Sequence, residues 1–133
     1  MELVILLFIL VGLVLLLLWF GRTGRKLMPA ISRIICAKWG KLENTKDPRA
    51  LLEADKLLDF VLANRGYRGS LGEKLKQANA CFSNPNAVWQ AHKARNQLAH
   101  ELEFKLTEKE LQKYLQFFKR GLKDLGVKGL GRN

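Results

Sequence analysis

The chain has 133 residues and a formal net charge of +11, so after its apolar N-terminal block only one small domain remains. We therefore expect no second catalytic domain. The basic balance indicates an anionic partner, but residues 21–46 hold seven Lys or Arg against one acid (net +6) and residues 47–125 hold fourteen against ten (net +4). More than half of the excess lies beside the apolar block, where a membrane explains it as well as RNA does.

Residues 3–20 form an uninterrupted apolar run, LVILLFILVGLVLLLLWF. As a helix, this run would be about 27 Å long, which is enough to cross a bilayer. A cleaved signal peptide would carry basic residues in front, whereas here Glu2 precedes the run and Arg and Lys follow it. We therefore predict a single-pass transmembrane anchor over residues 1–21. Because basic flanks face the cytoplasm, we expect a protein of the cell inner membrane or plasma membrane whose C-terminal domain is cytoplasmic.

Residues 22–46 are a basic juxtamembrane segment. Within residues 25–42, basic side chains are mixed with apolar ones that recur approximately at helical spacing. This pattern predicts a short interfacial helix lying on an anionic membrane surface. The alternative is a linker whose apolar residues pack on the domain.

Residues 47–125 contain four helix patterns with local start signals. Asp47-Pro48 precedes a helix that stops near Gly66, and a capping box at 70–73 precedes a helix to about Ala80. A cap at 83–86 precedes a helix over about 86–100, and a capping box at 107–110 precedes a helix to about Leu125. Short connections and the lack of an alternating strand pattern predict an all-α, four-helix bundle. Residues 126–133 lack a packing pattern and are expected to form a flexible tail.

The third of these helices carries the unusual polar groups. At 100° per residue, one side of it holds Trp89, His92, Asn96 and His100, and another side holds Ala87, Ala91, Ala94 and Leu98. The small apolar side predicts close packing on the core, so the polar side is expected to lie elsewhere. Arg95 falls between the two sides, so its stem can run along apolar surface while its guanidinium reaches the polar side.

Arg95 and His100 have the chemistry that RNA cleavage without a metal requires. A histidine moves a proton to or from a ribose hydroxyl or the leaving oxygen, and an arginine stabilises the charge that develops on the phosphate. The alternative is structural, with His100 capping the helix C-terminus. Arg95 would then pair with an acid of the first bundle helix, either Glu53, Asp55 or Asp59.

Metal and disulfide chemistry are not expected. His92, Asn96 and His100 stand at i, i+4 and i+8, but no carboxylate or thiolate has a matching spacing, so we predict no metal site and no cofactor. Cys36 and Cys81 are far apart in the sequence and are expected to be reduced thiols rather than a disulfide.

The six residues Arg95-Asn96-Gln97-Leu98-Ala99-His100 match the R-x4-6-H motif of HEPN domains, and the motif falls late in a four-helix domain, as in that family. Residues 47–125 thus resemble the HEPN-like domains of small membrane-anchored bacterial proteins. The resemblance implies a domain that dimerises so that the motif helices approach each other. In active members it implies a metal-independent endoribonuclease that leaves a cyclic phosphate. His100 would be the acid or base, Arg95 would bind phosphate, and Asn96 would orient them.

Some residues depart from the family pattern. Leu102 stands two residues after the motif histidine, where toxin-type members carry a tyrosine. Trp89 and His92 have no place in the motif, and we interpret them as substrate-binding or interface residues. Two hypotheses follow: a membrane-tethered HEPN-like domain that binds or cuts RNA, and a non-catalytic homodimerisation or protein-interaction module at the inner membrane surface.

Overall fold

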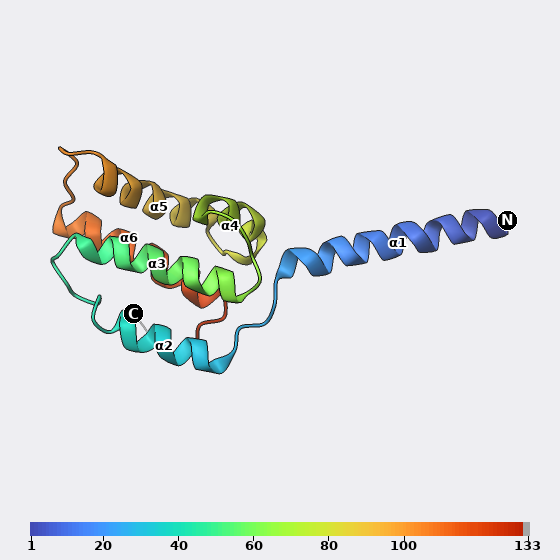
Figure 1. Cartoon of the computed structure of the whole chain (residues 1–133), viewed down its shortest axis with the longest axis horizontal. Coiled ribbons are helices and arrows are strands. Elements are labelled where there is room, and N and C mark those ends of the chain that lie inside the picture. The colour runs from blue at the N-terminus through green and yellow to red at the C-terminus, as the bar shows by residue number, and fades with distance from the viewer. Residues whose placement is uncertain (132–133) are drawn as a thin grey trace.

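The structure is a computed structural model that describes residues 1–131, without the side chains of residues 20–23. Its elements are α1 (Glu2–Thr23), α2 (Pro29–Trp39), α3 (Arg49–Asn64), α4 (Leu71–Gln77), the short 3-10 helix η1 (Asn79–Cys81), α5 (Pro85–His100) and α6 (Glu108–Asp124). No strand occurs within residues 1–131, so the all-α prediction is confirmed. Figure 1 shows α2 to α6 gathered into a bundle.

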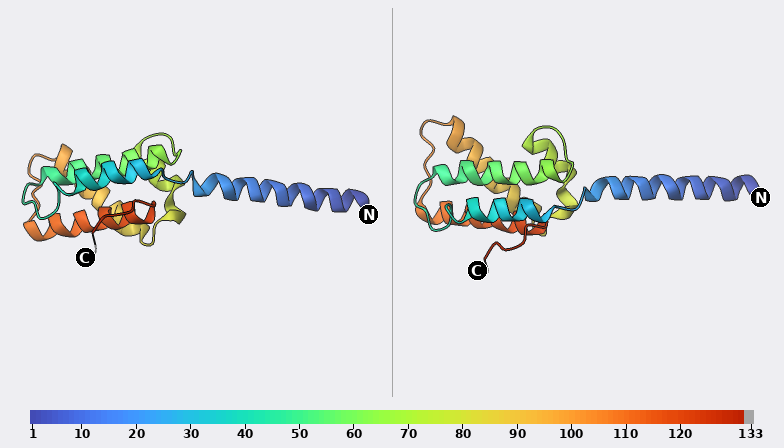
Figure 2. Two further views of the ribbon diagram at one scale, coloured as in Figure 1. Left: turned by 90° about the horizontal axis from the view of Figure 1, so that it is seen from below. Right: turned by 60° about the horizontal axis from the view of Figure 1, so that its bottom comes forward.

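The N-terminal helix α1 projects from one end of this bundle, as all three views show (Figures 1 and 2). The predicted apolar N-terminal helix is confirmed. Its stretch Glu2–Trp19 has a mean hydropathy of 3.0 and no buried residue, and it is long and apolar enough to cross a membrane.

The helix α2 is a part of the bundle. Ile35 is fully buried and Trp39 is only 3% exposed, whereas Ile34 is 44% exposed. The half-buried Ile31 precedes Ile35 by one turn, so the side of α2 that faces the core is the one with an i, i+4, i+8 spacing. Ile31, Ile35 and Trp39 therefore pack on the domain, as in the alternative interpretation, and the interfacial helix stays a prediction for the exposed side of α2.

The predicted helix starts are confirmed by their caps. Ser70 and Thr107 each accept a hydrogen bond from the backbone N–H three residues later, and the glutamate at that position returns it, as a capping box requires. Asn84 accepts from the N–H of Ala87 at the start of α5. At the start of α3, the Asp47 carboxylate accepts from the N–H of Arg49.

Small residues bring α5 close to α6. Ala87, Ala91 and Ala94 are buried, as predicted from their spacing. On the facing side of α6, a Cβ added to Gly121 would lie 3.2 Å from Val88 Cγ2, a distance that leaves almost no room for any side chain. Close packing of these two helices fixes which residues of α5 are turned toward α3.

The tail packs on α2 as far as the structure describes it. Val127 and Leu130 are buried, and the N–H of Lys128 donates to Ser32 Oγ at 3.2 Å. Val127 and Leu130 therefore pack on the bundle, although the sequence predicts a flexible tail there, and residues 132–133 lie outside the described part. Two apolar residues spaced three apart are too few to produce a recognisable periodic pattern. The thiol of Cys36 donates to the Lys128 carbonyl, and both cysteines are free, as expected.

Candidate functional site

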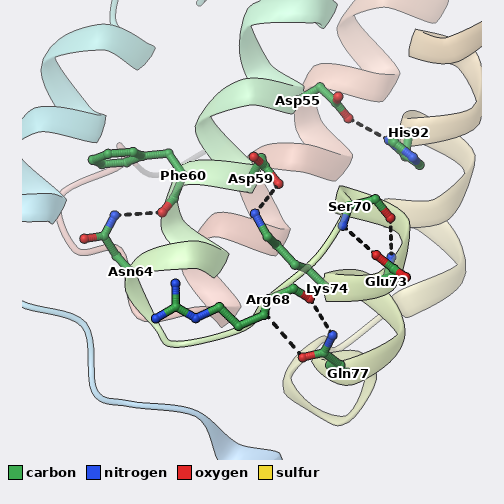
Figure 3. Close-up of polar contacts among 10 residues, drawn as sticks. All are labelled: Asp55, Asp59, Phe60, Asn64, Arg68, Ser70, Glu73, Lys74, Gln77 and His92. Atoms are coloured by element: carbon green, nitrogen blue, oxygen red, sulfur yellow. Dashed lines mark hydrogen bonds and ion pairs between the residues drawn. The ribbon is translucent and has the colours of Figure 1, made fainter.

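The carboxylate of Asp55 is the centre of a polar cluster between α3 and α5. Asp55 is 4% exposed and lies on the side of α3 that faces the core. Its Oδ1 is 2.8 Å from His92 Nδ1, the hydrogen bond drawn in Figure 3, and its Oδ2 is 2.9 Å from Arg95 Nε. The second contact is an ion pair and not a hydrogen bond. A buried carboxylate is costly unless it is paired, and here two groups of α5 pair it.

Asn96 closes the cluster into a ring. Its Oδ1 accepts a hydrogen bond from Arg95 Nη1 at 2.9 Å, and its Nδ2 lies 3.3 Å from His92 Nε2. One assignment satisfies every contact: His92 carries its proton on Nδ1, donates to Asp55 and accepts from the Asn96 amide at Nε2. In this arrangement, both nitrogens of the imidazole and the carboxylate already have protein partners.

The cluster forms one wall of an open pocket of about 770 Å³. It is lined by residues of α3, of the α3–α4 loop with the start of α4, and of α5; they include Lys56, Asp59, Phe60, Gly69, Leu71, Arg95 and Asn96. Phe60 is 43% exposed and lies at the outer edge, away from His92 (Figure 3). The pocket therefore combines an exposed aromatic ring with charges of both signs.

Two polar contacts hold the α4 wall of this pocket (Figure 3). The buried Lys74 places its Nζ 2.8 Å from Asp59 Oδ1 on α3. The Glu73 carboxylate accepts from the Ser70 N–H at 2.7 Å, and the hydrogen bonds with the backbone and hydroxyl of Ser70 lower the pKa of Glu73. Lys74 therefore ties α4 to α3, and Glu73 stabilises the start of α4.

Trp89 supports the cluster from the preceding turn of α5. Its ring is half-buried and meets the His92 ring edge to face, with centroids 6.0 Å apart. A Cβ added to Gly72, at the start of α4, would lie 3.8 Å from the Trp89 ring. The indole thus packs between the imidazole and α4, and it contacts the cluster without adding a polar group to it.

His100 is separated from this cluster. It is the last residue of α5 and is exposed, and it does not line the pocket that contains Arg95 and Asn96. Of the five site residues predicted from the sequence, the structure brings together Trp89, His92, Arg95 and Asn96. Arg95 pairs with Asp55, as in the structural alternative, and His100 lies at the helix C-terminus.

The sequence did not single out Asp55. It named this residue only as one of three acids that Arg95 could pair with. A stronger signal was present, because Leu51, Asp55, Leu58 and Leu62 share one helical side of α3. An acid within a leucine stripe is expected to be buried and paired. Within residues 1–131, no three His, Cys, Asp or Glu side chains lie close enough together to hold a metal ion.

Comparisons of the chain with protein-family models, curated proteins and solved structures find no match.

Proposed function

We propose that the chain is a non-catalytic interaction module, anchored in a membrane by α1, that associates with a second copy of itself through the face around the α3–α5 pocket. The observation that carries this proposal is the pairing of both Arg95 and His92 with Asp55, while His100 stands outside the pocket. Side chains whose charges and hydrogen bonds are already paired within the protein stabilise a surface more readily than they attack a substrate.

The anchor follows from the hydropathy of α1 and the charge beside it. No residue of Glu2–Trp19 is buried in the isolated chain, so a bilayer is the solvent that suits this stretch. The basic residues after α1 support an orientation with the bundle on the cytoplasmic side of a cell inner membrane or plasma membrane.

A second copy is the partner that suits this face by charge. The pocket is lined by two acids, Asp55 and Asp59, and two bases, Lys56 and Arg95, on a chain whose net charge is +11. Two copies of so basic a chain repel each other overall, and a face without net charge lets them meet at low electrostatic cost. A two-fold contact pairs a surface with itself, which a patch of mixed charge permits. The exposed Phe60 supplies the apolar anchor.

Replacing Phe60 by aspartate tests this interface. We expect the full chain in detergent micelles to self-associate at least about tenfold more weakly after Phe60→Asp, because an aromatic anchor contributes about 2 kcal/mol or more to an interface. Sedimentation equilibrium would measure the change. Ile34→Asp is the matched control, since Ile34 is 44% exposed on α2 and Phe60 is 43% exposed. A monomeric wild-type chain, or an equal loss in both variants, would contradict the proposal.

A second proposal is that this face binds RNA and cleaves it without a metal, as the resemblance to HEPN domains implies. The observation that favours it is that Arg95 and Asn96 line one open pocket, where the Arg95 guanidinium donates a hydrogen bond to the Asn96 amide oxygen. A guanidinium fixed in this way suits a phosphate. In this proposal Arg95 binds phosphate, His100 exchanges the proton and Asn96 orients these two side chains, with His92 and Trp89 at the flank.

The nuclease is tested by incubating the full chain with RNA in the presence of a chelator. Cleavage that leaves a cyclic phosphate and falls at least about 100-fold in His100→Ala would support it, since general acid–base catalysis contributes about that much. His100 is exposed, so its replacement is expected to leave the fold intact, and Lys93→Ala on the same helix is a control that is also exposed. Absence of cleavage, or cleavage that persists in His100→Ala, rules this proposal out.

A further inference from the structure

The junction between α1 and the bundle is fixed by close contacts. The N–H of Arg25 donates to the Arg65 carbonyl at 2.7 Å, and Arg65 Nε donates back to the Arg25 carbonyl at 3.0 Å. Gly24 has φ +63°, and a Cβ there would lie 2.9 Å from the buried ring of Tyr67. Desolvation of this ring raises the pKa of Tyr67 to about 12. The segment after α1 is therefore tied to the α3–α4 loop, and one end of the bundle faces α1 (Figure 1).

That end is strongly basic. Residues 24–33, 64–69, 76–82 and 123–128 lie there and contain eight bases, Arg25, Lys26, Arg33, Arg65, Arg68, Lys76, Lys123 and Lys128. They contain one acid, Asp124, whose carboxylate accepts hydrogen bonds from the N–H and the hydroxyl of Ser83.

The far end has the opposite sign. Residues 40–48 and 97–110 contain four Lys and six Asp or Glu, which is a net charge of −2. Both segments lie at the end of the bundle opposite α1 (Figures 1 and 2). The bundle is thus polarised along its length, with its positive end beside the apolar helix.

A groove opens on the basic end between the start of α2 and the end of α6. Lys26, Arg33 and Lys128 line it and are exposed, and Met28 beside them is 65% exposed. Cationic side chains around an exposed apolar one suit the boundary between lipid headgroups and acyl chains.

We infer that this basic end, centred on Lys26, Arg33 and Lys128, binds the phosphate headgroups of anionic phospholipids in the bilayer that α1 crosses. The inference rests on the proposed anchor. RNA also carries phosphates, but the contacts at Gly24 and Arg25 hold this end against the anchor, where lipid phosphates are the anions at hand. Headgroup binding would keep the bundle upright, with the α3–α5 face turned sideways toward neighbouring copies and the acidic end toward the cytoplasm.

Hydrogen exchange of the full chain in lipid nanodiscs tests this inference. One set of discs contains phosphatidylcholine alone, and the other contains phosphatidylcholine with phosphatidylglycerol. We expect amides of residues 24–33 and 124–128 to exchange at least about fivefold more slowly with the anionic lipid, while amides of residues 101–106 at the far end stay unchanged. The double variant Arg33→Glu/Lys128→Glu should lose this difference, and Lys105→Glu/Lys109→Glu, at the far end, should retain it.

The outcomes separate the inference from the anchor. A chain that leaves both kinds of disc contradicts the anchor, and the inference falls with it. A chain that stays in the discs but exchanges equally in both compositions overturns the headgroup contact alone. Protection that appears in phosphatidylcholine discs when RNA is added, and not with the anionic lipid, would also overturn it and assign the basic end to nucleic acid.

Discussion

Asp55→Ala is expected to lower the free energy of unfolding by about 3 kcal/mol, at the lower end of the range for breaking a buried ion pair. The side chain of Asp55 is 5% exposed, and removal of its carboxylate leaves Arg95 and His92 without their shared partner. The Arg95 side chain is 26% exposed and can recover some hydration, which is why we expect the lower end. Denaturant unfolding of the full chain in detergent, followed by tryptophan fluorescence, would measure the loss.

Glu53→Ala is the control for this prediction. Glu53 lies on the same helix and pairs with Lys56, but both side chains are more than half exposed. Such a surface pair contributes about 0.5 kcal/mol or less, so the control should unfold almost as the wild type does. Equal stability of the two variants would contradict a structural role for the cluster.

The double variant Asp55→Ala/Arg95→Ala separates the ion pair from general damage. Once the carboxylate is gone, the guanidinium is a partly buried charge without its partner, so its removal should cost less than in the wild type. We expect a coupling energy of about 1–3 kcal/mol between the two positions. Because Arg95 supports the fold, loss of RNA binding in an Arg95 variant would not by itself assign it to a site. Replacement of the exposed His100 is the cleaner probe.

Features that depend on a few neighbouring residues could be predicted from the sequence. The capping boxes at Ser70 and Thr107, the cap at Asn84 and the alanine side of α5 are local signals, and the structure confirms them. Each depends on geometry within one or two turns of helix, which the sequence spacing fixes directly.

Features that depend on distant contacts were not predictable in the same way. His92 and Arg95 lie on one side of α5, but only the packing of α3 against α5 shows that Asp55 meets both of them. On α2, two neighbouring isoleucines lie on different sides of the helix: Ile35 is buried and Ile34 is exposed. Periodicity finds an apolar stripe but does not identify the surface that covers it, and here the bundle covers it rather than a membrane.

Ile35→Ala should therefore lower the free energy of unfolding by about 3 kcal/mol, as expected for a large residue removed from a packed core. Ile35 is fully buried, so truncation of its side chain leaves a cavity between α2 and the rest of the bundle. Trp39, one turn later, packs on the same side and would lose part of its support. The change would be measured by denaturant unfolding in detergent, with the fluorescence of Trp39 and Trp89 as the signal.

Ile34→Ala distinguishes this result from an effect of α2 on a membrane. Ile34 is 44% exposed, so its truncation should change the free energy of unfolding by less than about 1 kcal/mol. If the Ile35 side of α2 instead lay on the lipid surface, the two alanine variants would unfold alike and would differ only in how tightly the segment holds to vesicles. A large loss of stability in Ile35→Ala alone would place residues 29–39 inside the folding unit. The domain would then begin at α2, directly after the junction with α1.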